Sequence, residues 1–284
     1  MKKAAVGMLL LFFTGVFFIS CEKELDKELE NEDARIQSYL SENDIDVEPK
    51  ESGLYYIEIE EGDSISPVND DMVIVDVKGT ILNRPLDEIQ ADSNIRFVVG
   101  KNQVIAGLDE GVTYMRMGGK AKLIVPFKLA YYEPGNYTDY NTYHFELNLN
   151  NVVKDPKEWE LERINTYIED DTSIHVQTDT SGFYYIEEVA GEGTSPQEGD
   201  RVKINYKVTL LDHSIIDTSD TQPLEFTLGQ KEVISGLEKG VKMMKPEGEA
   251  TMIIPSSMAY GNQVRGSLMP YSTLVYKIRL LSVN

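Results

Sequence analysis

The side chains that most often carry enzyme chemistry are few and far apart in this sequence. The three histidines, His144, His175 and His213, are widely separated, and none has the spacing of a metal-ligand pair. The sequence has no phosphate-binding loop, no dinucleotide fingerprint and no nucleophile-elbow serine. We therefore expect no metal site, no cofactor and no hydrolytic centre of these kinds.

The single cysteine, Cys21, has a specific chemistry because of the residues that precede it. Two lysines near the start of the chain are followed by an uncharged run, Ala4 to Ile19, that is shorter than a comfortable membrane span. Ser20 and Cys21 resemble the lipobox of bacterial lipoproteins, whose cysteine becomes the lipidated first residue. The pattern predicts a signal peptide over residues 1–20 and a lipid anchor on Cys21. An ordinary secretory signal with an incidental cysteine is the alternative.

The chain is strongly acidic, with 48 Asp and Glu against 27 Lys and Arg and a net charge of −21. Phosphate backbones and anionic headgroups repel such a body, which excludes nucleic acid as a partner and leaves acyl chains to hold it at a membrane. Acidic residues after the cysteine (Glu22, Glu24 and Asp26) resemble the surface-export signal of some Bacteroidetes lipoproteins and fit a solvated tether equally well. We expect a cell-envelope location at the outer membrane, on its periplasmic face or at the cell surface. Nothing in the sequence indicates an oligomeric state.

A long internal repeat organises the rest of the chain. The motif SGLYYIE at Ser52–Glu58 returns as SGFYYIE at Ser181–Glu187, and many later residues recur at the same separation of 129 positions. A repeat of this length is a duplicated globular domain, because each copy can bury a core of its own. We expect an acidic tether with a short helix at residues 21–50 and domains at residues 51–153 and 182–284.

The segment between the domains, residues 154–181, is expected to begin as a linker helix. Asp155 is placed as an N-cap and Pro156 as a first-turn proline, and Leu161, Ile164 and Ile168 then follow at helical spacing.

Within each copy the apolar runs are short and resemble strands. In the second copy they cover residues 183–189, 201–211, 224–228, 250–254 and 273–281, and one helical stretch covers residues 235–243. This order predicts an α+β domain in which a curved antiparallel sheet wraps around one short helix.

The motifs of the second copy resemble the FKBP-type peptidyl-prolyl cis-trans isomerases. The resemblance runs through PLEFTLGQKEVISGLEKGV (Pro223 to Val241), IPSSMAYGN (Ile254 to Asn262) and PYSTLVYKIRLL (Pro270 to Leu281). The first copy is similar but looser, through IRFVVGKNQVIAGLDEGV (Ile95 to Val112), VPFKLAYY (Val125 to Tyr132) and TYHFELNL (Thr142 to Leu149). The resemblance implies two tandem domains of this fold and polypeptide substrates that contain proline.

Prolyl isomerisation needs a pocket and not a nucleophile. It rotates a C–N bond with a barrier of about 18–20 kcal/mol, and no bond is made or broken. The planar amide is more dipolar than the twisted transition state, so a dry apolar pocket favours the twisted form. The resemblance assigns Asp217, Tyr260 and the Ile234 backbone N–H to catalysis. It assigns the pocket walls to Tyr206, Ile216, Leu224, Phe226, Val233, Leu237, Leu268 and Tyr276.

Both copies depart from the family pattern. In the second, Ile216 replaces a usual phenylalanine and Leu237 a frequent tryptophan, which weakens the pocket without removing it. In the first, Val77 stands where the second copy has Tyr206, Leu86 where it has Ile216, Gln103 where it has Glu232, and Tyr132 where it has Gly261. Asp87 and Tyr131 keep their positions.

We therefore expect an exported isomerase that helps envelope proteins to fold, with its activity mainly in the second domain. The alternative is a lipoprotein without catalysis that uses these folds to bind peptides or glycans.

Overall fold

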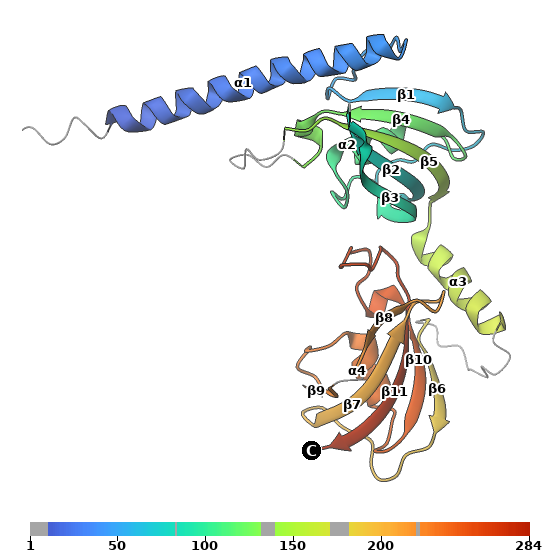
Figure 1. The fold of residues 1–284 in the computed structure, drawn as a ribbon. Helices are drawn as coiled ribbons and strands as arrows, with labels where there is room; N and C mark the ends of the chain where they lie inside the picture. The colour runs from blue at the N-terminus through green and yellow to red at the C-terminus, as the bar shows by residue number, and fades with distance from the viewer. Residues whose placement is uncertain (1–10, 83, 132–139, 171–181, 220–221) are drawn as a thin grey trace, which may run out of the picture. The chain divides into compact units, whose positions relative to one another are not determined.

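The computed structural model describes residues 11–82, 84–131, 140–170, 182–219 and 222–284 (Figure 1). The chain divides into two compact units, and each contains one antiparallel sheet and one short helix packed against it. The expected α+β class, with two tandem domains of this kind, is confirmed.

The N-terminal sheet has five strands in the order β1-β4-β5-β2-β3. They are β1 (Tyr55–Glu60), β2 (Met72–Ile81), β3 (Arg84–Val98), β4 (Lys120–Val125) and β5 (Tyr143–Val153). The helix α2 (Ala106–Gly111) and the 3₁₀ turns η1 (Val112–Tyr114) and η2 (Phe127–Leu129) connect them.

The C-terminal sheet has the order β6-β10-β11-β7-β8, and β9 also pairs with β7. The strands are β6 (Tyr184–Val189), β7 (Arg201–Thr209), β8 (Ile215–Thr218), β9 (Leu224–Thr227), β10 (Glu249–Ile254) and β11 (Leu274–Val283). The helix α4 (Ser235–Val241) and the 3₁₀ turn η3 (Ser256–Met258) complete this domain. Inward side chains of alternating residues form one core, which includes Val202, Ile204 and Val208 on β7.

Two glycines let α4 lie close to the sheet. A Cβ atom at Gly236 would stand 2.2 Å from Ile254 Cγ2, and one at Gly240 would stand 2.2 Å from Met252 Sδ. Gly107 and Gly111 have the same role on α2, where an added Cβ would meet Val125 and Leu123 at 2.4 Å. A side chain at any of these positions would force either the helix or the buried side chain beneath it to move.

Each domain is preceded in sequence by a helix that packs on it. Helix α1 (Leu11–Glu42) is longer than the short helix expected from sequence, and its residues Ile36 and Leu40 are buried in the N-terminal body. Helix α3 (Pro156–Asp170) begins as expected, since the Lys157 and Glu158 N–H groups donate to Asp155 Oδ1 at 3.1 and 3.0 Å. Residues 171–181, the rest of the expected linker, lie outside the described residues. Within the part of the chain that is described, no helix is long and apolar enough to cross a membrane.

Candidate functional site

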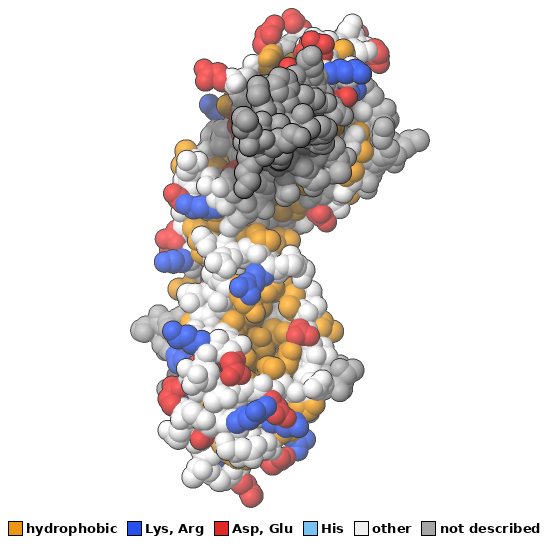
Figure 2. All heavy atoms as spheres, turned by 90° about the vertical axis from the view of Figure 1, so that its left-hand side faces the viewer, with side chains coloured by type: hydrophobic (Ala, Val, Ile, Leu, Met, Phe, Trp, Pro, Cys, Tyr) orange, Lys and Arg blue, Asp and Glu red, His pale blue; other side chains and the backbone are white. Residues whose placement is uncertain are grey.

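The expected pocket residues of the second copy lie together around one apolar cluster. Four of them are buried in it, namely Phe226, Leu237, Leu268 and Tyr276. Six are partly buried and pack against it, namely Tyr206, Ile216, Leu224, Val233, Ile234 and Tyr260. Figure 2 shows hydrophobic side chains gathered on one face of the C-terminal body, the lower one in the view, with charged side chains at the margins. The residues come from β7, β8, β9, β11, α4 and the loops beside them, so the folded sheet assembles the set.

Asp217 joins this set through a hydrogen bond. The Tyr206 hydroxyl donates to Asp217 Oδ2 at 2.5 Å, and the Thr218 N–H donates to Asp217 Oδ1 at 2.8 Å. The pairing of β8 with β7 places Asp217 beside Val208, two residues along the strand from Tyr206. The carboxylate is exposed to solvent and is fixed by these two donors.

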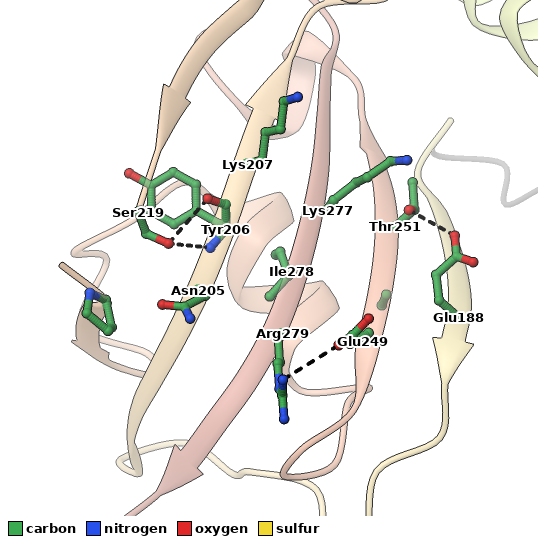
Figure 3. Close-up of a pocket in the computed structure, with 12 residues that line it drawn as sticks. Glu188, Asn205, Tyr206, Lys207, Ser219, Glu249, Thr251, Lys277, Ile278 and Arg279 are labelled. Carbon is green, nitrogen blue, oxygen red and sulfur yellow. Dashed lines mark hydrogen bonds and ion pairs between the residues drawn. The ribbon is translucent and has the colours of Figure 1, made fainter. Parts of the chain in front are cut away.

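Ser219 holds the end of β8 against β7. Its hydroxyl accepts from the Tyr206 N–H at 2.6 Å and donates to the Tyr206 carbonyl at 3.2 Å, as Figure 3 shows. The Ser219 N–H donates to the same carbonyl at 2.9 Å. The backbone of Tyr206 is therefore anchored on the side from which the Asp217 strand approaches.

Two phenols of the site, those of Tyr206 and Tyr276, remain protonated near neutral pH because their pKa values are raised. Burial, and then the hydrogen bond to Asp217, raise the pKa of Tyr206 to about 12. Burial also raises the pKa of Tyr276, whose ring centroid lies 5.8 Å from that of Tyr206. Both hydroxyls can therefore act as donors at physiological pH.

The start of α4 presents a backbone donor. Ile234 has an extended conformation (φ −62°, ψ 147°), and its carbonyl accepts from the Leu237 and Glu238 N–H groups. The Ile234 N–H itself has no acceptor among the described residues. It can therefore bind an acceptor from outside the chain.

Tyr260 follows η3 and lies at the other side of the cluster. Its ring packs against the core, and the guanidinium carbon of Arg265 lies 5.0 Å from the ring centroid. Arg265 and Leu268 pair through two backbone hydrogen bonds of 2.9 Å, which closes the loop that carries the buried Leu268.

A depression of about 770 Å³ lies on the outer face of the same sheet (Figure 3). Its walls include Lys207, Lys277, Arg279 and Glu249. Side chains alternate along a strand, so Lys207 faces away from the core on which Tyr206 packs. Most of the side chains that line this depression are polar or charged, so it is a poor match for a proline ring, and we do not assign the site to it.

The N-terminal copy differs at the position of Tyr206. Val77 is only 4% exposed and offers no hydroxyl group. Tyr131 is exposed, and its ring meets that of Tyr143 at a centroid distance of 5.3 Å. The Val98 N–H donates to Gln103 at 2.8 Å, as the Thr227 N–H does to Glu232 at 3.4 Å, so this local contact is kept in both copies. The side chains of Leu86 and Asp87, and Tyr132, lie outside the described residues.

Sequence reasoning missed a buried charged residue next to this site, Glu160 on α3, which is 5% exposed. It also missed the buried Ser219 and Ser256. A glutamate on a helix rich in polar residues is expected to be exposed to solvent. The available signal was its recurrence, because Glu32 precedes Ile36 by the same four positions that separate Glu160 from Ile164.

Comparison with known proteins matches each of the two domains to one family model. The family model of the FKBP-type peptidyl-prolyl cis-trans isomerase matches residues 63–150 and again residues 192–281. The isomerase FkpA of Escherichia coli is 39% identical over 111 residues, which cover 38% of this chain and 40% of that protein. A probable FkpA of Neisseria meningitidis is 38% identical over 112 residues, again 38% of this chain and 40% of that protein.

Among solved structures, the crystal structure of FkpA from Escherichia coli is 34% identical and covers 45% of this chain and 61% of that chain, with a TM-score of 0.41. The matched region spans less than half the length of each of the two curated relatives named above. The two family matches together cover more than half of this chain, which belongs to the FKBP-type peptidyl-prolyl cis-trans isomerase family and carries two copies of its domain.

Proposed function

We propose that this chain is a peptidyl-prolyl cis-trans isomerase and folding helper of the cell envelope, with its activity mainly in the C-terminal domain. The observation that carries the proposal is the hydrogen bond of 2.5 Å from the Tyr206 hydroxyl to Asp217, at the edge of an apolar cluster. This hydrogen bond places a carboxylate beside the apolar side chains that would hold a proline ring. We propose that the substrates of the protein are polypeptides that contain proline.

The arrangement supports catalysis by differential binding. The proline ring packs on the apolar side chains, with Leu237 as the floor and Tyr276 and Phe226 as walls. Little water remains around the amide there, so the less dipolar twisted form is favoured over the planar ground state. The Ile234 N–H and the Tyr260 hydroxyl hold carbonyl groups of the peptide, and Asp217 faces the rotating amide.

We propose that the N-terminal domain does not catalyse this reaction appreciably. Val77 is buried and cannot hold Asp87 as Tyr206 holds Asp217. This difference favours peptide binding without catalysis, or a structural role, for this copy alone.

We also propose that Cys21 carries a lipid anchor, which holds the protein at the outer membrane on its periplasmic face or at the cell surface. The apolar run before Ser20 and Cys21 supports this assignment. In cells that express the full chain, a labelled fatty acid should be incorporated into the wild type and not into Cys21→Ala. Equal labelling of both proteins would contradict the proposal.

The catalytic proposal is tested on the full chain with a proline-containing tetrapeptide in a protease-coupled assay. Asp217→Ala and Tyr260→Phe should each lower kcat/KM by about 10²-fold, the lower end of what a preorganised polar group contributes to transition-state stabilisation.

The matched controls are Asp87→Ala and Tyr131→Phe at the equivalent positions of the first copy, and these should leave kcat/KM unchanged. A folded wild-type chain with no rate above background would refute the enzymatic function. Equal losses from the two pairs of variants would refute the assignment to the C-terminal domain.

A further inference from the structure

A buried carboxylate ties α3 to the loop that carries Tyr260. Glu160 Oε1 accepts from the Ser256 N–H at 2.7 Å and from the Thr273 hydroxyl at 2.7 Å. Glu160 Oε2 accepts from the Ser256 hydroxyl at 2.6 Å. A buried carboxylate is costly unless its oxygens are hydrogen-bonded, and here both oxygens are. We refer to these three hydrogen bonds as the Glu160 clamp.

The clamp holds Ser256, and Ser256 in turn holds the loop that contains Tyr260. The Ser256 carbonyl accepts from the Ala259 and Gly261 N–H groups, both at 2.8 Å. These two amides lie immediately before and after Tyr260. The position of Ser256 therefore determines where the backbone of Tyr260 lies, and Glu160 determines the position of Ser256.

Apolar packing on α3 fixes the clamp in place. Ile164, one turn after Glu160, is 1% exposed and packs with Tyr184, Ile253 and Val275 on the sheet. The helix is thereby attached to β6, β10 and β11, so its carboxylate approaches the loop from a rigid element.

The N-terminal body repeats the arrangement with α1. Glu32 Oε1 accepts from the Phe127 N–H and from the Thr142 hydroxyl, both at 2.8 Å. Ile36 and Leu40 follow Glu32 at the spacing at which Ile164 and Ile168 follow Glu160, and Ile36 packs with Ile124 on β4. The duplicated unit is therefore a helix together with a domain, and the carboxylate clamp belongs to it.

We propose that Glu160 is a positioning residue for prolyl isomerisation, acting through Ser256 on the Tyr260 hydroxyl, so that α3 is part of the catalytic unit of the C-terminal domain. The proposal rests on the assignment of catalysis to that domain. Glu160 lies outside the two segments that the family model matches, whereas Tyr260, the donor that it positions, lies inside the second segment.

The chemistry of the clamp indicates which substitutions are informative. An alanine removes both carboxylate oxygens, and with them all three hydrogen bonds, and leaves the Ser256 N–H buried without a partner. A glutamine keeps one oxygen for the Ser256 N–H and the Thr273 hydroxyl, and its amide group can donate to the Ser256 hydroxyl oxygen. Glu160→Gln should therefore rescue most of what Glu160→Ala loses.

The test measures kcat/KM of the full chain and hydrogen exchange of the Ala259 and Gly261 amides. Glu160→Ala should lower kcat/KM on the order of tenfold to a hundredfold, since a small misplacement of a catalytic group has effects of this size. The two amides should exchange faster, while the amide of Met252 in the core strand β10 should not change. Glu160→Gln should stay within about threefold of the wild type, because it keeps the acceptor for the Ser256 N–H.

Glu32→Ala is the matched control, because it removes the same clamp from the other copy. It should leave kcat/KM unchanged. In a Tyr260→Phe background, Glu160→Ala should cost a smaller factor than it does alone, because the hydroxyl it positions is already absent. A purely structural role of Glu160 would not produce this coupling.

The proposal is overturned if folded Glu160→Ala keeps the wild-type kcat/KM. It is also overturned if the loss of kcat/KM in the double variant equals the product of the two single losses, because the two residues would then act independently. If Glu160→Ala does not fold, Ser256→Ala takes its place, since it removes the hydroxyl partner of Oε2 alone; an unchanged kcat/KM then refutes the proposal. If the wild type has no activity, the enzymatic function fails, and the clamp is judged by exchange. Unchanged exchange at Ala259 and Gly261 would then refute it.

Discussion

Removing one oxygen atom from Tyr206 separates the polar from the apolar contribution at the site. Tyr206→Phe keeps the ring that stands 5.8 Å from the ring of Tyr276 and removes the donor to Asp217. The apolar wall is unchanged, so any loss of activity measures the hydrogen bond and its effect on the carboxylate.

The cost in stability should be small. A hydrogen bond to a charged group contributes about 1.5–3 kcal/mol when the group is buried, and a typical net value is about 0.5–1.5 kcal/mol. Asp217 is exposed, so water replaces the lost donor and the lower range applies. We expect Tyr206→Phe to lower the free energy of unfolding of the C-terminal domain by about 1 kcal/mol.

The cost in activity should be larger than the cost in stability. Loss of the phenol leaves the Asp217 carboxylate held by the Thr218 N–H alone, so its orientation toward the peptide is less well fixed. We therefore expect kcat/KM to fall about tenfold, which corresponds to about 1.4 kcal/mol. The protease-coupled assay on the full chain measures the rate, and urea unfolding followed by near-ultraviolet circular dichroism measures the stability. Tyr185→Phe is the control, because Tyr185 packs against the same core from β6 and lies outside the proposed site.

The pH of the assay does not confound this comparison. The pKa of Tyr206 is about 12 in the folded chain, above its ordinary value of 10.0, so folding favours the protonated phenol. Its contribution to stability is complete below pH 10 and is lost as the pH rises through about 12. The reasoning is refuted if Tyr206→Phe keeps kcat/KM within about twofold, below a 0.5 kcal/mol change, while Asp217→Ala loses activity.

Three further predictions follow from the packing and the charges. Gly236→Ala should destabilise the C-terminal domain by about 1–3 kcal/mol in urea unfolding, and much less in an Ile254→Ala background that lacks Cγ2; equal costs in both would contradict the close approach. Gly261→Ala should lower the free energy of unfolding of the same domain by about 1 kcal/mol, because φ is +62° at this position, although a Cβ atom would meet no atom within 4 Å. A variant that is more stable than the wild type in urea unfolding would contradict this. Burial raises the pKa of Glu32 above 4.5, so its contribution to stability is greatest below pH 4.5 and is lost as the pH rises through its folded-state pKa. The difference in stability between wild type and Glu32→Gln should therefore change with pH above 4.5, and a constant difference would refute it.

The sequence predicted the strands of the C-terminal copy well because burial on one face leaves an alternating pattern. The runs at residues 201–211 and 273–281 lie over β7 and β11, and the helical stretch at residues 235–243 lies over α4. Strand β8 was missed because Ile215–Thr218 has only four residues and follows the polar turn at Asp212 and Ser214. Its pairing depends on Ser219 reaching the Tyr206 backbone, a contact between segments that no local pattern reports.

The motifs predict the residues of the candidate site, but they do not predict the residue that holds the Tyr260 loop in position. The resemblance placed Tyr206, Asp217 and Tyr260 by their positions in the motifs, and the structure brings them to one cluster. Glu160 was missed because its burial is created by Ser256 and Thr273, which lie about a hundred positions further along the chain. A charged residue becomes a core residue only when such distant partners satisfy it.

The duplicated unit has consequences for how the two copies diverge. Both keep the carboxylate clamp, whereas only the second copy has a serine hydroxyl to fill the second carboxylate oxygen, since Phe127 stands where it has Ser256. The second copy also keeps Tyr206, while the first has the buried Val77. A clamp retained in a domain without the phenol is explained by fold stability alone. The C-terminal copy has one additional hydrogen bond, from the Ser256 hydroxyl to Glu160, next to the loop of Tyr260. We attribute this bond to the need to position the Tyr260 hydroxyl precisely.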